Sequence, residues 1–426
     1  MKRFWMAAIL AMLTAPAFAI IGTVDDVPAA TLLLPYFEVD LDNPDGVTTL
    51  MSINNASATA VLAHVVIWTD LSIHILDFNV YLTGYDVQSI NLRDILVDGN
   101  LPITASAGQD PTDTISPKGP SSQDINFASC NGQLPYDNPA LDATYLDHVQ
   151  SALTGQASVV FFGGKCSGID HGDRIARGYI TVDAVNNCAQ DFPQDIGYFG
   201  AGGTGSATNQ NVLWGDYFYV NPEQSFAQGE TLVHIEADST LGAGNYTFYH
   251  RYVSAANGED NREGLGNIFA ARFVIGGLFD GGTSLLTWRD SKYPIVPFSC
   301  ALPYPSQFPL GQNQVVVFDE EENYEVPEGC QISPCPPTEG IIPFPWEAQR
   351  TVVGSASLPT TFSFGWMFLN LNFANGSTHV PFDPLMQNWV SPVMDAKGTL
   401  SVGFDAVQLG NVTDPATASD AQIAVP

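Results

Sequence analysis

The segment VLAHVVIWT, Val61–Thr69, has the pattern of a β-strand that is buried on both faces. In an extended chain successive side chains point to opposite faces, and here both sets are mainly apolar. The turn-forming cluster Asn54–Ser57 precedes the segment and limits its length on that side. The pattern therefore predicts a central strand that is covered on both sides.

Similar short segments continue along the whole chain. Strands are predicted in the first half at 48–53, 78–82, 87–92, 158–162, 177–185 and 212–220. In the second half they are predicted at 232–237, 246–253, 268–275, 284–288, 314–318, 361–371 and 400–409. The 38 glycines and 29 prolines favour many turns over long helices. We therefore expect an all-β protein of two β-sandwich domains, immunoglobulin-like or jelly-roll-like, at 20–235 and 236–426.

One segment departs from the strand pattern. Apolar side chains recur at helical spacing within Ala140–Leu153, Asn138 and Pro139 precede it, and Gly155 follows it. This predicts one short helix near 140–153, which begins after the cap at Asn138. The polar stretches 104–126 and 191–211 are interpreted as long surface loops, and the second domain carries Pro-rich loops at 293–309 and 327–345.

The first nineteen residues have the three parts of a secretory signal peptide. Met1–Arg3 is cationic, the following residues to Pro16 are uncharged and mostly apolar, and Ala17–Ala19 matches a small-residue cleavage site. The apolar part is too short to span a bilayer, and no second apolar run reaches the length of a membrane helix. We expect a secreted, periplasmic or cell-surface protein after cleavage near Ala19.

The expected mature chain is strongly acidic. Without Lys2 and Arg3 it keeps 12 of the 14 basic residues against 45 acidic ones, which gives a net charge of −33. Such a charge repels nucleic acid, which is therefore not an expected partner, and attracts divalent cations. Adaptation of the surface to a saline medium is an equally open interpretation. Glycan or protein partners at the cell surface are also compatible with this composition.

The six cysteines of an exported chain indicate disulfides. They fall into two groups of three, at Cys130, Cys166 and Cys188, and at Cys300, Cys330 and Cys335. Within these groups the weakly preferred pairings are Cys166 with Cys130 or Cys188, and Cys300 with Cys330 or Cys335. A zinc site is the rival interpretation, but the chain has no Cys-x-x-Cys pair.

The region 25–92 resembles a group of uncharacterised secreted bacterial proteins. The resemblance rests on TLMSINN (Thr49–Asn55), on the hydrophobic strand that follows and on DFNVYLTGYDV (Asp77–Val87). It implies an immunoglobulin-like N-terminal β-sandwich and an exported location. It implies no catalytic residues, because the group supplies none to carry over.

Two Asp-rich segments are candidate metal sites. Asp40, Asp42 and Asp45 lie in the sequence DLDNPDG, whose carboxylates could hold Ca²⁺. An EF-hand is excluded, because Pro44 and Met51 occupy ligand positions, and Asn-Pro-Asp-Gly is also a strong β-turn sequence.

The second candidate is the segment that contains Asp170, His171 and Asp173. It could bind a cation or supply an acid and a base, but an exposed loop with Asp173 paired to Arg174 or Arg177 explains it more simply. The acidic run Asp319–Glu322, with Glu325 and Glu328, is likewise interpreted as a solvated strand end, and a divalent-cation site is the alternative.

Two aromatic segments, at 214–219 and 288–290, combine rings with carboxylates. Such groups can bind sugars, although alternating aromatics more often form the core face of a strand. Motifs of metalloproteases, serine hydrolases, P-loop proteins and dinucleotide-binding proteins are absent from the sequence. No catalytic residue is assigned, and the sequence favours a binding or structural role in the cell envelope or extracellular space. An extracellular hydrolase acting on polysaccharide or peptide through carboxylates, and a subunit of a surface layer, are the alternatives.

Overall fold

The computed structural model describes residues 27–104, 114, 119–123, 125, 127–135, 139–156, 167–188, 190–241, 247–253, 258–290, 308–327, 341–372, 386–397 and 400–409. The expected signal peptide at 1–19, the predicted strand at 158–162, and Cys166, Cys300, Cys330 and Cys335 lie outside these residues. No helix among the described residues has the length and hydropathy needed to cross a membrane.

The protein is mostly β-structure, as the sequence predicts. Strands of the first half are β1 (Thr31–Asp40), β2 (Thr48–Asn55), β3 (Val61–Thr69), β4 (His74–Leu82), β5 (Val87–Asn91), β6 (Ile175–Val185), β7 (Leu213–Trp214), β8 (Asp216–Asn221), β9 (Phe226–Thr231) and β10 (Val233–Ile235). Strands of the second half are β11 (Ile268–Val274), β12 (Gly282–Arg289), β13 (Gln314–Phe318), β14 (Tyr324–Glu325), β15 (Ala348–Val352), β16 (Phe364–Asn370), β17 (Asn388–Ala396), β18 (Leu400–Gly403) and β19 (Val407–Gln408).

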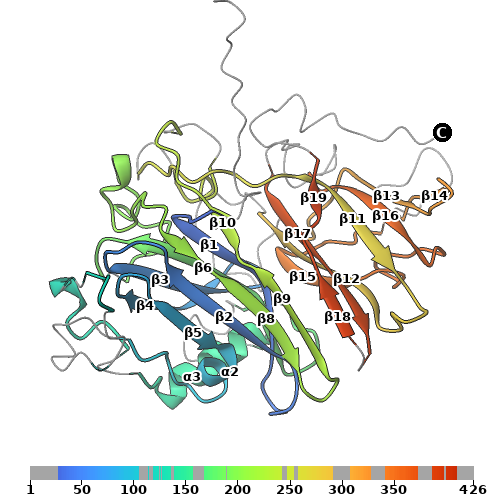
Figure 1. Cartoon of the computed structure of the whole chain (residues 1–426). Coiled ribbons are helices and arrows are strands. Elements are labelled where there is room, and N and C mark those ends of the chain that lie inside the picture. Colours follow the sequence, from blue (N-terminus) through green and yellow to red (C-terminus); the bar gives the residue numbers. More distant parts are fainter. Residues whose placement is uncertain are drawn as a thin grey trace, which may run out of the picture.

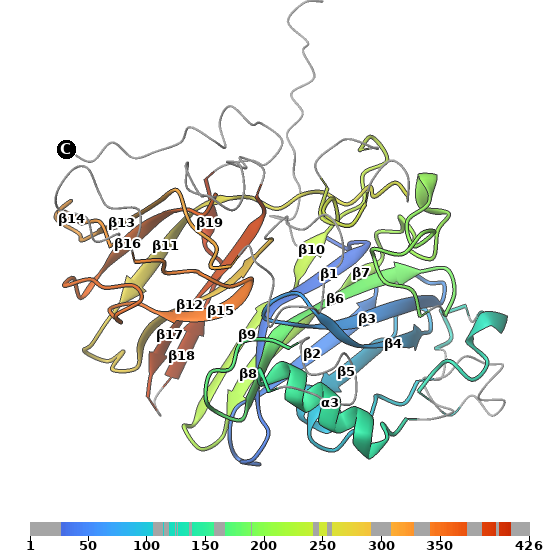
Figure 2. The ribbon, with the colours of Figure 1, turned by 180° about the vertical axis from the view of Figure 1, so that it is seen from behind.

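These strands form four antiparallel sheets. The first sheet has the order β10-β1-β6-β3-β4, and the second has β5-β2-β8-β9 with β7 also on β2. The third sheet is β14-β13-β16-β11-β19, and the fourth is β15-β12-β17-β18. Figure 1 shows the strands up to β10 beside those from β11 onward, and Figure 2 shows the same division from behind. Each half is thus a sandwich of two sheets.

The sandwich cores follow from the alternation of side chains. Strand β3 is buried along its whole length, which confirms the prediction from its two apolar faces. In the second half, Leu285 belongs to the core between the third and fourth sheets, whereas Leu286 belongs to the core of the first half. The fourth sheet therefore contributes to both cores, and the core of the first half extends onto it.

Helices are few among the described residues. They are α2 (Leu92–Leu96), α3 (Ala143–Leu153) and the short 3-10 helices Ala128–Cys130 and Ala201–Gly203. Helix α3 is the short helix expected near 140–153, but its start differs from the prediction. Asp142 is the N-cap residue, because its carboxylate accepts hydrogen bonds from the backbone amides of Thr144 and Tyr145.

Three other predictions need correction. Residues 247–253 form turns instead of the predicted strand, because the Asp260 carboxylate holds the backbone amide of Tyr249. The segment 191–211 is not only a surface loop, since Tyr198 is buried and donates a hydrogen bond to Asp183. Cys130 pairs with Cys188, so the preferred pairing of either one with Cys166 is wrong. The bond joins the 3-10 helix Ala128–Cys130 to the segment that follows β6, over a small core of its own.

Candidate ligand-binding site

The first acidic segment, at 40–46, is a turn whose polar atoms bind one another. One oxygen of Asp40 accepts hydrogen bonds from the backbone amides of Asp42 and Asn43, each at 3.0 Å. The guanidinium of Arg93 donates to the backbone carbonyls of Asp40 and Gly46, at the two ends of the turn, and to that of Val47. Asp42 lies 3.5 Å from Arg174. The oxygens that a cation would need are thus largely engaged.

The remaining predicted metal candidates do not converge either. The backbone amide of Asp45 donates to the side chain of Asn43. Asp170 accepts a hydrogen bond from the backbone of Gly172, and Asp173 forms two hydrogen bonds with Arg177. Among the described residues no group of three or more His, Cys, Asp or Glu side chains is arranged to hold a metal ion.

His171 has a partner that sequence reasoning missed. Its Nε2 lies 3.1 Å from Oδ2 of Asp70, whose other oxygen accepts a hydrogen bond from the backbone of Ile169. Burial raises the pKa of Asp70, and the contacts with His171 partly offset that effect. The backbone carbonyl of Asp70 in turn accepts from the amides of Glu347 and Ala348. This arrangement fastens a loop of the first half to the second half.

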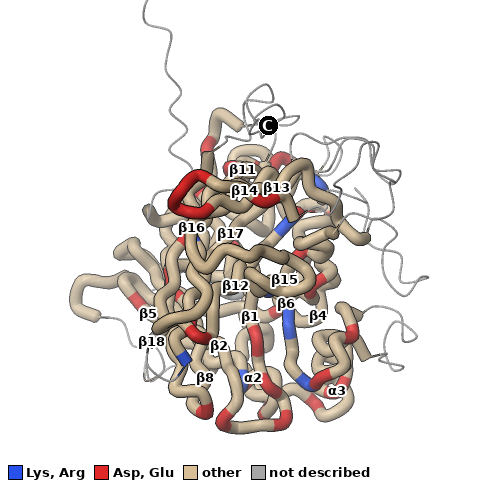
Figure 3. Tube along the Cα trace, turned by 90° about the vertical axis from the view of Figure 1, so that its right-hand side faces the viewer, with Lys and Arg blue, Asp and Glu red and all other residues tan. Residues whose placement is uncertain are grey.

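The acidic run after β13 forms the tight connection to β14. Figure 3 shows a continuous acidic segment beside β14. Asp319 accepts hydrogen bonds from the side-chain amide of Asn323 and from the backbone amides of Asn323 and Glu321, and these bonds lower its pKa. Glu325 binds Thr360 and Thr361 through its side chain. Asp319 therefore shapes the hairpin, and Glu325 joins it to the segment before β16.

The aromatic segments divide between core and surface. Trp288 is buried, as are Tyr217 and Tyr219, which agrees with the core interpretation. Trp214 and Phe218 are 42% and 43% exposed, so for them that interpretation is wrong. They lie on the outer face of the second sheet because they alternate with the buried tyrosines along the chain.

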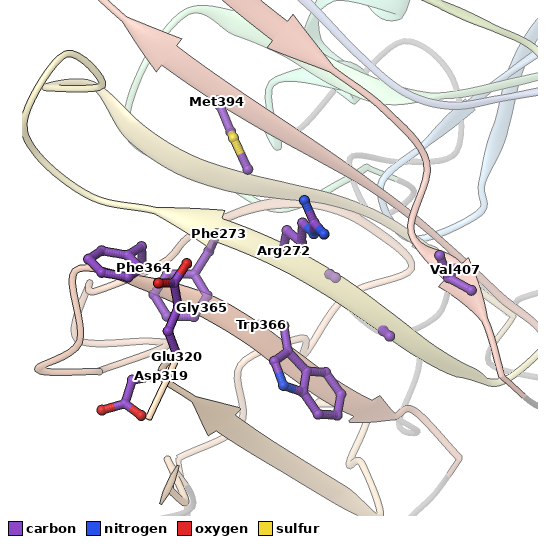
Figure 4. A pocket seen from close by; sticks show the side chains of 11 residues that line it. Arg272, Phe273, Asp319, Glu320, Phe364, Gly365, Trp366, Met394 and Val407 are labelled. Carbon is purple, nitrogen blue, oxygen red and sulfur yellow. The ribbon is translucent and has the colours of Figure 1, made fainter. Parts of the chain in front are cut away.

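A pocket lies beside β11 and β16 in the third sheet. Its volume is about 530 Å³, within the range of small-ligand sites. The side chains that line it include Arg272, Phe364, Trp366, Asp319 and Glu320. Figure 4 shows Asp319 and Glu320 near Phe364 at one end of the pocket. Arg272 lies apart from them, as does Trp366, which is farther along β16. The lining thus combines aromatic residues, a cation and two carboxylates.

The register of the strands places Arg272, Trp366 and Phe318 on one face of the third sheet. Arg272 is directly opposite Trp366, and Trp366 is directly opposite Phe318. The rings of Trp366 and Phe318 stack with their centroids 4.7 Å apart and 14° between their planes, which fixes the indole. A side chain at Gly365 would meet the backbone carbonyl of Phe318, so glycine allows β13 and β16 to approach at this point.

Arg272 differs from the other arginines of the described chain. It is exposed, and within the described residues it makes no hydrogen bond or ion pair. The other described arginines all have such partners: Arg93, Arg174, Arg177, Arg251, Arg262, Arg289 and Arg350. An unpaired guanidinium is notable in a chain with 45 acidic and 14 basic residues. It is available to bind an anionic group from outside.

The lining residues can bind a ligand in three ways. The Trp366 ring offers an apolar face, Arg272 offers a fork of donors to a carboxylate, and Glu320 offers acceptors to hydroxyl groups. Sequence reasoning predicted both strands but did not single out Arg272 or Trp366. The alternation of Phe364, Trp366 and Phe368 was the available signal, because it places three aromatic side chains on one face of β16.

No family model, curated protein or solved structure matches this chain.

Proposed function

We propose that this chain is an exported binding protein that holds an acidic sugar unit of an extracellular glycan in the pocket beside β11 and β16. The unpaired guanidinium of Arg272 next to the fixed Trp366 ring is the observation that supports it. Arg272 pairs with the carboxylate of the sugar, and Trp366 contacts its apolar face. Glu320, at the other end of the pocket, accepts hydrogen bonds from hydroxyl groups.

The location belongs to the same proposal. A signal peptide at 1–19 would deliver the chain to the periplasm, the cell surface or the medium, where glycans are found. The resemblance of residues 25–92 to secreted proteins with an immunoglobulin-like start supports this placement. The first two sheets, which pack as a sandwich, are compatible with that resemblance.

The test is calorimetric titration of the mature protein with two matched sets of oligosaccharides, one rich in uronic acids and one neutral. We expect the pocket to bind the acidic set more tightly and Arg272→Gln to remove that preference. Trp366→Ala should weaken binding by about tenfold or more, which corresponds to about 1.4 kcal/mol. Arg174→Gln, an exposed arginine outside the pocket, is the control and should bind as the native chain does.

Two results would overturn the proposal. One is absence of a preference for acidic oligosaccharides in the native chain, and the other is unchanged binding in both pocket variants. Chromatography of the oligosaccharides after incubation also tests the alternative function. Shortened products from the native chain would favour an extracellular hydrolase over a binding protein.

A further inference from the structure

The outer face of the second sheet is an open surface with large apolar side chains. Trp214 and Phe218 are 42% and 43% exposed, and Val87 on β5, on the other side of β2, is 57% exposed. Several exposed apolar side chains on one sheet face are unusual for a surface without a partner. This face belongs to the first sandwich, whereas the pocket belongs to the second.

The register of the strands arranges this face in rows. Ser89, Ser52, Asp216 and Thr231 form one polar row across four strands, with Ser52 bonded directly to Asp216. On one side of it lies a row that contains Val87, Asn54 and Trp214. On the other side lies a row that contains Asn91, Leu50, Phe218 and Gly229. An aromatic ring therefore flanks the polar row on each side.

The polar row is held in place by its own hydrogen bonds. Ser52 Oγ donates to Oδ1 of Asp216 at 2.7 Å, and the amide of buried Asn54 donates to Ser52 Oγ at 2.9 Å. Oδ2 of Asp216 has no hydrogen-bond partner among the described residues, so it can accept a bond from a ligand. The row thus presents a fixed acceptor between the two rings.

The Phe218 ring is also fixed in position. A Cβ atom added to Gly229 would lie 2.3 Å from Cε1 of Phe218, so the ring rests over the glycine of the adjacent strand. Glycine at 229 leaves the space that lets the ring lie against the sheet. Trp214 and Phe218 are four residues apart along the strand direction, about 13 Å. That separation exceeds one sugar ring and suits an oligosaccharide.

We propose that this face is a second binding surface, one that takes a neutral polysaccharide chain. The two rings contact the apolar faces of successive sugar units, and Asp216 accepts a hydrogen bond from a hydroxyl between them. The face has no Lys or Arg among the residues of its three rows and carries the carboxylate of Asp216, so an anionic polymer is disfavoured on this face. The inference does not depend on the function proposed for the pocket.

A second copy of this chain is a weaker fit to the same face. A two-fold pairing centred on the polar row would bring Asp216 of each copy against the other, and like charges that meet in this way cost several kcal/mol. A polysaccharide with hydroxyl groups and no charge meets no such repulsion. The polar row therefore favours the sugar chain.

The experiment is affinity gel electrophoresis of the mature protein in gels that contain one of three neutral polysaccharides: a β-1,4-glucan, an α-1,4-glucan or a mannan. We expect retardation by at least one of them. Trp214→Ala and Phe218→Ala should each weaken that binding by about tenfold or more. Asp216→Asn, which keeps the shape of the side chain, should weaken it less.

Two control variants test whether the retardation depends on this surface alone. Leu278→Ala removes a side chain that is 80% exposed in the second half, and it should leave retardation unchanged. Trp366→Ala alters only the pocket and should also leave it unchanged, so the two sites can fail independently. Circular dichroism melting of each variant shows that the fold is kept.

Three results would overturn the inference. They are no retardation of the native chain in any of the three gels, retardation that survives in both Trp214→Ala and Phe218→Ala, and retardation lost equally in Leu278→Ala. Sedimentation velocity adds a fourth. If the native chain is a dimer and Phe218→Ala is a monomer, the face is occupied by a second copy instead of a polysaccharide.

Discussion

The guanidinium of Arg262 lies 3.7 Å from the carboxylate of Asp183, and both side chains are 0% exposed. Asp183 also accepts hydrogen bonds from the hydroxyl groups of Thr31, Tyr198 and Tyr249. Strands β1 and β6 are thereby joined to two segments that have no strand of their own. Without Arg262 the buried carboxylate of Asp183 would have no cationic partner, and an uncompensated buried charge strongly destabilises the folded state.

Arg262→Met should therefore lower the free energy of unfolding by about 3–5 kcal/mol. The substitution keeps most of the side-chain volume but leaves Asp183 and the neighbouring Asp260 without their cation. Urea denaturation followed by tryptophan fluorescence measures the change. Arg174→Gln breaks an exposed ion pair and should cost less than about 1 kcal/mol. Equal losses in the two variants would show that burial of the Arg262 pair is unimportant.

Replacing both Cys130 and Cys188 by serine should destabilise the protein. The bond closes a loop with a sequence separation of 58 residues, and removing such a crosslink typically costs about 2–4 kcal/mol. Thermal melting of the double variant measures the loss, with the exposed Ser357→Ala as the control. Mass spectrometry of the unreduced native protein should yield a peptide with Cys130 linked to Cys188. A peptide with Cys166 linked to either one would contradict the structure.

The β-sandwich architecture was predictable because most strands carry a local pattern. Val61–Thr69 and Gln314–Phe318 have the bounds that alternation and turn residues predict. Strand β1 was missed because Pro35 interrupts it, and proline has no backbone donor for a sheet. The structure places Pro35 where the register of β1 and β6 shifts between Leu34 and Phe37, so an irregularity accommodates it.

The candidate sites were less predictable, because they depend on which strands become neighbours. Arg272 and Trp366 are far apart in the sequence, and only the pairing of β11 with β16 places them opposite each other. Trp214 and Phe218 lie in an aromatic segment that is evident from the sequence. Their side chains and those of Tyr217 and Tyr219 point to opposite faces, and the packing of the second sheet decides which face is buried. Period-two alternation separates the two faces and does not indicate which one is covered.

Asp40→Ala tests whether the turn at 40–46 is a calcium site. We expect it to lower the melting temperature by the same amount in calcium and in chelator. The reason is that the lost interactions are hydrogen bonds from the backbone amides of Asp42 and Asn43, worth about 1–3 kcal/mol together. Melting curves of native and variant protein in both buffers decide the question. If calcium stabilises the native chain but not the variant, the turn binds the cation.

Glu263 should make the protein more stable as the pH falls from neutral toward about 5. Burial raises the pKa of this carboxyl to about 7, and the carboxylates of Glu236 and Asp238 add to the shift. The folded chain therefore holds a proton that the unfolded chain releases between its ordinary value of 4.5 and 7. The neutral carboxyl therefore stabilises the folded chain fully below pH 4.5. This stabilisation is lost as the pH rises through about 7.

Glu263→Gln removes this titration and keeps the shape of the side chain. The carboxyl is only half buried, so after solvent screening the effect should be about 1 kcal/mol. The variant should be more stable than the native protein at pH 8 by that amount and equally stable at pH 5, because the native carboxyl is already neutral there. Urea denaturation across this pH range measures the difference, with exposed Glu321→Gln as the control. A variant that is less stable than the native protein at pH 8 would mean that the charged form of Glu263 has a stabilising partner, and the sign of the argument would be reversed.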